Sequence, residues 1–477
     1  MNFPFFRKWA AFLLLPLSTL FHTEAKHRII VFLQEGLGHE LDRAAKLYSD
    51  EETLWDWRYD SNWQVSSLST LPLVNDREPN QGEPFSKLSY DSLYAWNGSV
   101  KQETEETSNL RKTFDGYHWL ISNASDARQA TSAFSIGQPS FVGASNWHYL
   151  PPEDGAPAPY GQHLLEWAHE QGLKTGVVSD MPFTYPTNTI LAGAREYEDD
   201  EGYERFNQLL QSTHLDLYIA TGHPKYNEAG QALSEPKYQF CDPKEWRNLR
   251  GHARSLGWEV VFGDENLMGV NSGNNGGHNR RLVILQFGDT SDTSGMQSNT
   301  FGLSGNLYSS ISFQLKSALS YLDQSEEGFL LVVHLGRLPH FLANEFQFEA
   351  LQDVLHLYKC LDLTSEWVED NGGWNSTSLL AGSLYEFGLI WGSDSSSFAY
   401  SQINDRGKKK VPGMRINHLG STAALTPLIY RGPSSGSLDD FFEGKDPIYG
   451  NYLSLQSLHE WIRKMPNNSK SVIDQSN

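Results

Sequence analysis

The sequence is poor in cysteine and has fewer basic than acidic residues. Of 477 residues only 2 are cysteine, and 37 Lys and Arg stand against 58 Asp and Glu, which gives a formal net charge of −21. So few cysteines exclude a small disulfide-built domain, and the acidic excess argues against a nucleic-acid partner held through its phosphates. Cys241 and Cys360 could pair in an oxidising compartment or stay as two buried free thiols, because the sequence does not give their separation.

Long apolar runs are missing beyond the first residues of the chain. Arg7 and Lys8 precede an apolar stretch over 9–21 that is too short to span a bilayer, and Thr23-Glu24-Ala25 resembles a small-residue cleavage site. These features predict that residues 1–25 are a secretory signal, with a retained N-terminal anchor as the alternative. We therefore expect a secreted or periplasmic protein with no membrane association after cleavage.

The rest of the chain alternates between two kinds of pattern. Short apolar or β-branched runs predict strands over 28–33, 174–179, 215–221, 258–262, 281–287, 328–333, 387–392 and 427–430. Helical spacing of apolar residues fills several of the intervals, for example around 164–168, 351–358 and 455–462. This alternation predicts an α/β fold with a large, mostly parallel central sheet and helices on both faces.

No linker rich in proline or serine divides the chain. We therefore expect one domain over 26–463 and a polar tail over 464–477. An aromatic-rich stretch at about 48–117 interrupts the alternation and is interpreted as an insertion. Aromatic side chains are common anchors at interfaces, so this insertion could be a binding surface, although a cap packed on the sheet is the simpler explanation and is favoured. Its most prominent members are Trp55, Trp57, Tyr59, Trp63 and Trp96.

Several segments, taken in order, resemble motifs of one enzyme family. Residues 29–38 are similar to a first strand with a G-D-G-M-G turn, with Glu35 in place of the Asp, and residues 126–137 are similar to a nucleophile helix D-S-A-A-S-A-T-A-x-x-T-G. Residues 329–338 are similar to F-x-L-M-V-E-G-G-R-I, and 379–388 and 417–433 are similar to two later segments. The family is alkaline phosphatase, and the resemblance runs from residue 29 to about 445. It implies the three-layer alkaline-phosphatase-like fold, and a homodimer by analogy.

The chemistry of that family needs residues that this sequence lacks. Its members transfer phosphate to a serine between two zinc ions, with a magnesium ion nearby and an arginine on the phosphate. The serine position holds Ala127, and the Glu ligand position holds His334. The resemblance places further non-ligating residues where other ligands are expected, namely Tyr185, Pro339, Ala343, Leu384 and Tyr385.

Only weak metal candidates remain, and we expect no zinc or magnesium site of the usual kind. They are Glu35, Thr187, His334 and His418. By resemblance, Asp126 and Arg195 are candidates for holding a phosphate-like anion, although an ion pair with a purely structural role is the alternative. Ser125 and Ser132 flank the lost nucleophile and could be imagined as substitutes, but a neighbouring position on a turn or helix points its side chain away, by about 100° per helical residue.

The sequence thus predicts an exported, alkaline-phosphatase-like protein without confident catalytic residues, a pseudoenzyme whose cleft retains an anion or partner-binding role. The first alternative is an active phosphomonoesterase that uses zinc and magnesium in a reorganised site. The second is a binding protein that acts through its aromatic surface.

Overall fold

The computed structural model describes residues 26–49, 62–73, 89–98, 115–143, 145–146, 161–195, 202–263, 280–288, 290, 301–395, 400–433 and 435–474. The predicted signal at 1–25 lies outside these residues. None of the described helices combines the length and the apolar character needed to cross a bilayer.

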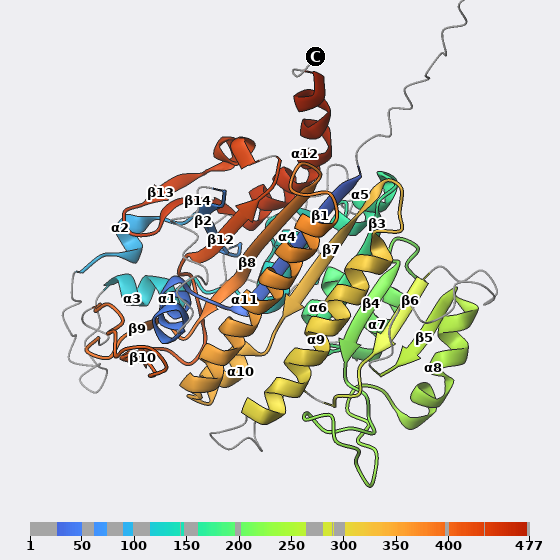
Figure 1. The fold of residues 1–477 in the computed structure, drawn as a ribbon. Helices are drawn as coiled ribbons and strands as arrows, with labels where there is room; N and C mark the ends of the chain where they lie inside the picture. Colours follow the sequence, from blue (N-terminus) through green and yellow to red (C-terminus); the bar gives the residue numbers. More distant parts are fainter. Residues whose placement is uncertain are drawn as a thin grey trace, which may run out of the picture.

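The described residues build one 12-stranded sheet through the middle of the molecule (Figure 1). In spatial order its strands are β13 (Gly444–Asp446), β14 (Gly450–Ser454), β2 (Gln64–Ser69), β12 (Thr426–Arg431), β8 (Thr377–Phe387), β1 (His27–Gly36), β7 (Gly328–Leu335), β3 (Lys174–Pro182), β4 (Leu217–Thr221), β6 (Arg280–Ile284) and β5 (Trp258–Phe262). The short strand β11 (Ser421–Thr422) pairs with β8 outside this path, and β9 (Ile390–Gly392) pairs separately with β10 (Met414–Ile416).

Most neighbouring strands are parallel, from β8 through β1, β7, β3, β4 and β6 to β5. The antiparallel pairs are β12 with its two neighbours, β11 with β8, and β13 with β14. Parallel strands covered on both faces need continuous apolar sequence, and β7 is buried at every position. The predicted α/β architecture is confirmed.

Helices cover both faces of the sheet. One face packs against α4 (Ala127–Ile136), α5 (Leu164–Glu170), α6 (Pro186–Leu191), α7 (Gly202–Gln211), α8 (Pro243–Ser255) and α12 (Leu455–Asp474). The other packs against α1 (His39–Tyr48), α9 (Phe301–Leu322), α10 (Leu338–Ala343) and α11 (Gln347–Asp370). We call these the α4 face and the α11 face. Figure 1 shows α9 and α11 lying across the sheet on the near side.

Part of the aromatic-rich stretch belongs to the sheet, because β2 pairs with both β12 and β14. Two short helices from the same region, α2 (Ser92–Ala95) and α3 (Asp115–Ser122), form a third apolar cluster with residues near β9 and β11. A 3₁₀ helix, η2 (Ser435–Phe441), precedes β13. The helix α12 extends as far as Asp474, into the segment predicted to be a polar tail.

Candidate functional site

The candidate site lies at the carboxyl ends of β1, β7 and β3, where open parallel sheets usually bind their ligands. Glu35 is the second-to-last residue of β1. The last residue, Gly36, has a φ of 78°, which permits the turn into α1. His334 is near the end of β7 and pairs in register with Leu33 of β1 and Ser179 of β3. Because side chains alternate along a strand, Glu35 and His334 both project from the α4 face.

Glu35 is buried and receives hydrogen bonds on both carboxylate oxygens. Oε1 accepts from Thr187 Oγ1 at 2.6 Å and lies 2.9 Å from His334 Nε2. Oε2 accepts from Tyr385 at 2.9 Å and from Tyr185 at 3.3 Å. Four side chains from three different elements and one loop thus converge on one carboxylate.

The second ring nitrogen of His334 also faces an acceptor. His334 Nδ1 lies 2.7 Å from Asn188 Oδ1 and 3.0 Å from Ser179 Oγ. The amide of Asn188 is oriented by its own nitrogen, which donates to the carbonyls of Met181 and Pro182. Asn188 Oδ1 thus faces one ring nitrogen of His334 and the Glu35 carboxylate faces the other, and the imidazole forms a buried pair with Glu35.

The surroundings favour ionised Glu35. Burial alone raises the pKa of this carboxyl, but the hydrogen bond and charge of His334, with the hydroxyls of Thr187 and Tyr385, lower it below its ordinary value. Burial and the charge of Glu35 raise the pKa of the Tyr385 hydroxyl well above its ordinary value, so Tyr385 stays a donor. The cluster is therefore satisfied by the protein's own charges and hydrogen bonds.

These residues do not fit the zinc and magnesium of the alkaline phosphatase resemblance. A metal bound by His334 needs an accessible ring-nitrogen lone pair, and both ring nitrogens already lie within hydrogen-bond distance of protein oxygens. No group of three or more His, Cys, Asp or Glu side chains in the described part of the chain is arranged to hold a metal ion. The fourth weak candidate, His418, is half-buried between β10 and β11, and within the described residues it makes no hydrogen bond to Glu35 or His334.

Ala127 begins α4 beside this cluster. Asp126 is the N-cap of that helix, its Oδ1 accepting from the Gln129 amide at 2.7 Å and its Oδ2 from the Gly143 amide at 2.7 Å. The helix α4 packs against β8, the strand whose Tyr385 contacts Glu35. The position matched to the nucleophile therefore adjoins the strand ends and carries a methyl group.

The two neighbouring serines have other partners. Ser132 Oγ donates to the Arg128 carbonyl at 2.8 Å and accepts from the Asn146 amide at 2.7 Å. Ser125 Oγ donates to Thr70 Oγ1 at 3.3 Å, and both serines are buried. Their hydroxyls therefore serve local structure.

Arg195 follows α6 and pairs with Glu166 of α5. Its Nη2 lies 2.7 Å and 2.9 Å from the two carboxylate oxygens of Glu166. Asp126 Oδ1 caps α4 and Oδ2 accepts from the Gly143 amide, whereas Glu166 is a carboxylate that holds the Arg195 guanidinium. The role of Arg195 and Asp126 in anion binding stays a prediction.

A second buried polar cluster lies at the same ends of the strands but on the α11 face. The sequence did not lead us to predict it. Asp180 at the end of β3 accepts from the Gly336 amide at 2.8 Å, and Asp353 of α11 accepts from Tyr308 at 2.9 Å and Gln34 at 3.0 Å. Burial and the nearby charge of Asp353 raise the pKa of Asp180 to about 7, against the opposing effect of Arg337. Asp180 directly follows the strand predicted at 174–179, and this position could have identified it as a candidate site residue.

No protein-family model matches the sequence, and no curated protein sequence matches it. Solved structures do match. Alkaline phosphatase from the Antarctic bacterium TAB5 superposes with a TM-score of 0.58 at 14% identity, over 93% of this chain and 99% of that one. The chain has an alkaline-phosphatase-like fold.

Two further structures agree with this assignment. The alkaline phosphatase of Thermus thermophilus gives a TM-score of 0.56 at 14% identity over 95% of this chain and 96% of that chain. The cold-active enzyme from Shewanella sp. gives 0.55 at 12% identity, covering 92% and 99%. Likeness at this identity establishes the fold, as the resemblance implied, and leaves function to the residues at the strand ends.

Proposed function

We propose that this chain is a non-hydrolysing, exported protein with the alkaline-phosphatase-like fold, which acts in recognition. The observation that carries the proposal is the buried ion pair between Glu35 and His334. By resemblance, Glu35 stands where the family has a metal-binding Asp, Thr187 at the hydroxyl ligand and His334 at the Glu ligand. In this chain the partner beside Glu35 is an imidazole.

The replacement of the family's metal ligands by these residues is consistent with the absence of a bound metal charge. In the family a carboxylate shell neutralises the metal ions, whereas here one carboxylate faces one imidazole and the remaining partners are hydroxyls. Ala127 supplies no oxygen to attack phosphorus, so two requirements of phosphoryl transfer to the protein are missing together. Export rests on the sequence of residues 1–25.

Activity and metal content together test the proposal. The purified mature chain, incubated with zinc and magnesium, should not hydrolyse p-nitrophenyl phosphate in a chelator-sensitive manner, and elemental analysis should find no stoichiometric metal. Ala127→Ser should remain inactive, because a restored hydroxyl still lacks a metal beside it. Chelator-sensitive turnover by the wild type would overturn the proposal.

A further inference from the structure

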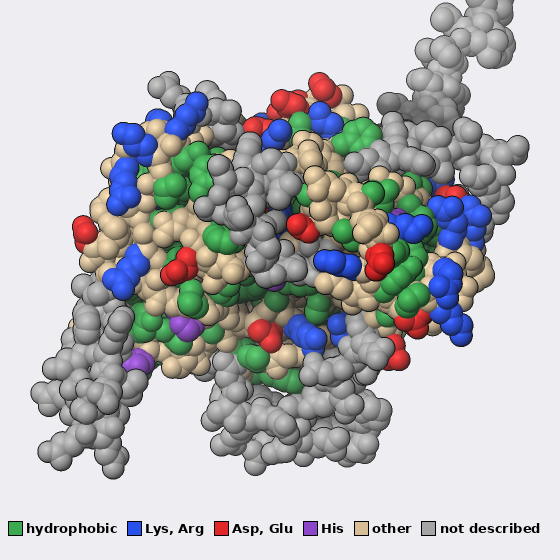
Figure 2. All heavy atoms as spheres, turned by 90° about the horizontal axis from the view of Figure 1, so that it is seen from below, with side chains coloured by type: hydrophobic (Ala, Val, Ile, Leu, Met, Phe, Trp, Pro, Cys, Tyr) green, Lys and Arg blue, Asp and Glu red, His purple; other side chains and the backbone are tan. Residues whose placement is uncertain are grey.

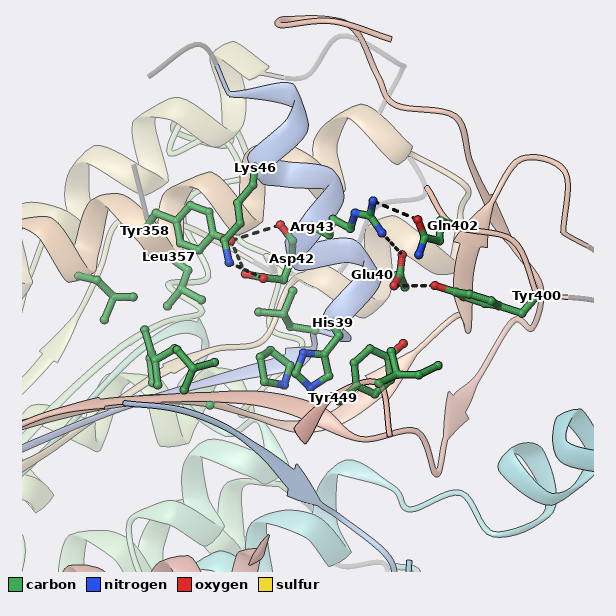
Figure 3. A pocket seen from close by; sticks show the side chains of 18 residues that line it. His39, Glu40, Asp42, Arg43, Lys46, Leu357, Tyr358, Tyr400, Gln402 and Tyr449 are labelled. Atoms are coloured by element: carbon green, nitrogen blue, oxygen red, sulfur yellow. Dashed lines mark hydrogen bonds and ion pairs between the residues drawn. The ribbon is translucent and has the colours of Figure 1, made fainter. Parts of the chain in front are cut away.

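A cavity of about 380 Å³ lies on the α11 face, across the sheet from the Glu35 cluster. It is enclosed between α1, α11 and the strands β2, β8 and β12, as Figure 3 shows with α1 above the sheet. Its volume is within the range of small-molecule sites. Neither the resemblance nor the candidate site accounts for it.

The floor of the cavity is apolar and belongs to the sheet and α11. It includes Val65 and Ile429 from neighbouring strands and Leu357 from α11. Val65 is 42% exposed although it lies on a sheet face, so apolar surface remains uncovered there. One side is a flat aromatic pair, His39 and Tyr449, whose rings stack at 4.2 Å with 8° between their planes. These surfaces suit the hydrocarbon or aromatic body of a ligand.

The opposite wall is the polar side of α1, and its charged groups differ in how firmly they are held. Lys46 Nζ lies 2.6 Å from Asp42 Oδ2, and Asp42 also accepts from Tyr358, so that carboxylate is fully used. Arg43 is held loosely, with Gln402 at 3.5 Å, Glu40 at 4.0 Å and a side chain that is 40% exposed. A loosely held guanidinium can form strong hydrogen bonds with a bound anion.

Glu40 is the second acidic group of this wall, and its Oε2 lies 4.0 Å from Arg43 Nη1. Its Oε1 accepts from Tyr400 at 3.0 Å, and burial raises the pKa of its carboxyl above the ordinary value, which favours the neutral form. Among the charged groups of this wall, Lys46 is paired closely with Asp42, whereas the contacts of Arg43 are long, so Arg43 is the group best placed to bind an anion.

A basic loop adjoins the C-terminal end of α1. The exposed residues Arg406, Lys408, Lys409 and Lys410 belong to it, and it is joined to α1 by a hydrogen bond of 2.8 Å from the Lys409 amide to the Tyr48 carbonyl. Lys408 Nζ also donates to the Lys46 carbonyl at 3.4 Å. Figure 2 shows Lys and Arg side chains along the left edge of the face seen from below, the side on which Figure 1 places α1, β9 and β10. In a chain of net charge −21 this local positive cluster would attract anions.

We propose that this cavity binds an apolar organic anion, a small molecule with a single anionic group on an aromatic or aliphatic body. The body lies on the floor of Val65, Leu357 and Ile429, and the anionic group pairs with Arg43 at the polar wall. The proposal does not depend on the function proposed for the Glu35 site, because the two lie on opposite faces of the sheet.

Two matched probes test it, anilinonaphthalene sulfonate and its uncharged analogue N-phenylnaphthylamine, titrated by fluorescence into the full mature chain. Arg43→Gln should weaken sulfonate binding by about tenfold, the value of one charge-assisted hydrogen bond, and leave the uncharged probe nearly unaffected. Val65→Trp, which fills the floor, should weaken both probes. Arg247→Gln, at an exposed position on α8, is the control and should change neither.

Near-UV circular dichroism checks that each variant is folded, and Arg43→Lys, which keeps the charge, should retain most sulfonate affinity if Arg43→Gln does not fold. Displacement of the probe by dodecanoate or by naphthoate supports the proposal and distinguishes an aliphatic from an aromatic body. Equal sulfonate affinity in the wild type, Arg43→Gln and Val65→Trp, or displacement by neither acid, would overturn it.

Discussion

The Nε2 atom of His334 lies 2.9 Å from Oε1 of Glu35, and neither side chain has any exposed surface. The two residues are 299 positions apart in the chain and stand on adjacent parallel strands. A buried ion pair of this kind is costly to break from one side, because the remaining charge is left without a partner or water.

Replacing one member of the pair should destabilise the protein far more than replacing both. His334→Leu leaves Glu35 charged and buried and should lower the free energy of unfolding by about 3–5 kcal/mol. The double variant Glu35→Leu/His334→Leu removes both charges and should recover much of that loss. Urea denaturation followed by circular dichroism measures the free energy of unfolding of the wild type, both single variants and the double variant. If the losses of the two single variants simply add in the double variant, the two side chains do not interact.

A carboxylate in place of His334 should allow the site to bind a metal ion. His334→Glu sets two buried carboxylates beside Thr187 with no counter-charge, and oxygen ligands of this type suit magnesium. We expect magnesium to raise the melting temperature of this variant and to leave the wild type unchanged. The neutral variant His334→Gln is the control, and a magnesium response there would argue against this explanation.

Glu386 should make the protein less stable as the pH rises towards neutrality. Burial raises the pKa of Glu386 to about 7, with the Thr422 hydroxyl and backbone amides opposing the shift. The folded state then binds a proton that the unfolded state releases at its ordinary pKa near 4.5, so this contribution is complete below that value and lost by about pH 7.

Glu386→Gln should therefore remove up to about 3 kcal/mol of the difference in unfolding free energy between acidic and neutral pH. Denaturation curves at a series of pH values measure this. Glu259→Gln, on the edge strand β5, is a suitable control, and an unchanged pH profile in Glu386→Gln would contradict the prediction.

Arg195 is expected to bind a phosphate-like anion while adding little to stability. Its pair with Glu166 is about one-third exposed, so Arg195→Ala should cost less than about 1 kcal/mol. Calorimetric titration with inorganic phosphate should give heat of binding in the wild type and none in Arg195→Ala. Arg254→Ala, which breaks the exposed pair with Glu259, should leave phosphate binding intact. Unaltered binding in Arg195→Ala would end the anion hypothesis for this residue.

Much of the sheet could be predicted from the sequence, because buried parallel strands are continuous apolar runs. The run predicted at 258–262 coincides with β5, and those at 28–33 and 328–333 lie inside β1 and β7. The strand β8 was not among the predicted runs, since Ser378, Gly382 and Ser383 interrupt its apolar residues. β2 was missed because its serines and the aromatic residues before it are not typical of a central strand.

The candidate site could be predicted only as separate residues. The motif resemblance identified Glu35, Thr187 and His334, but it gave no reason to expect that Glu35 and His334 bind each other. That contact depends on the register of β1 against β7 and on Asn188, which orients the ring from α6. Tyr385 was noted only as a lost ligand, although its hydroxyl completes the shell around Glu35.

Cys241 packs in the core of the α4 face, whereas Cys360 packs in the core of the α11 face, and both are free thiols. A layer of hydrogen-bonded strands separates the two sulfur atoms, and burial raises the pKa of each thiol to about 12. The native fold thus requires no oxidant to form and resists alkylation while intact. A reducing agent should leave its unfolding curve unaltered, whichever compartment the chain reaches.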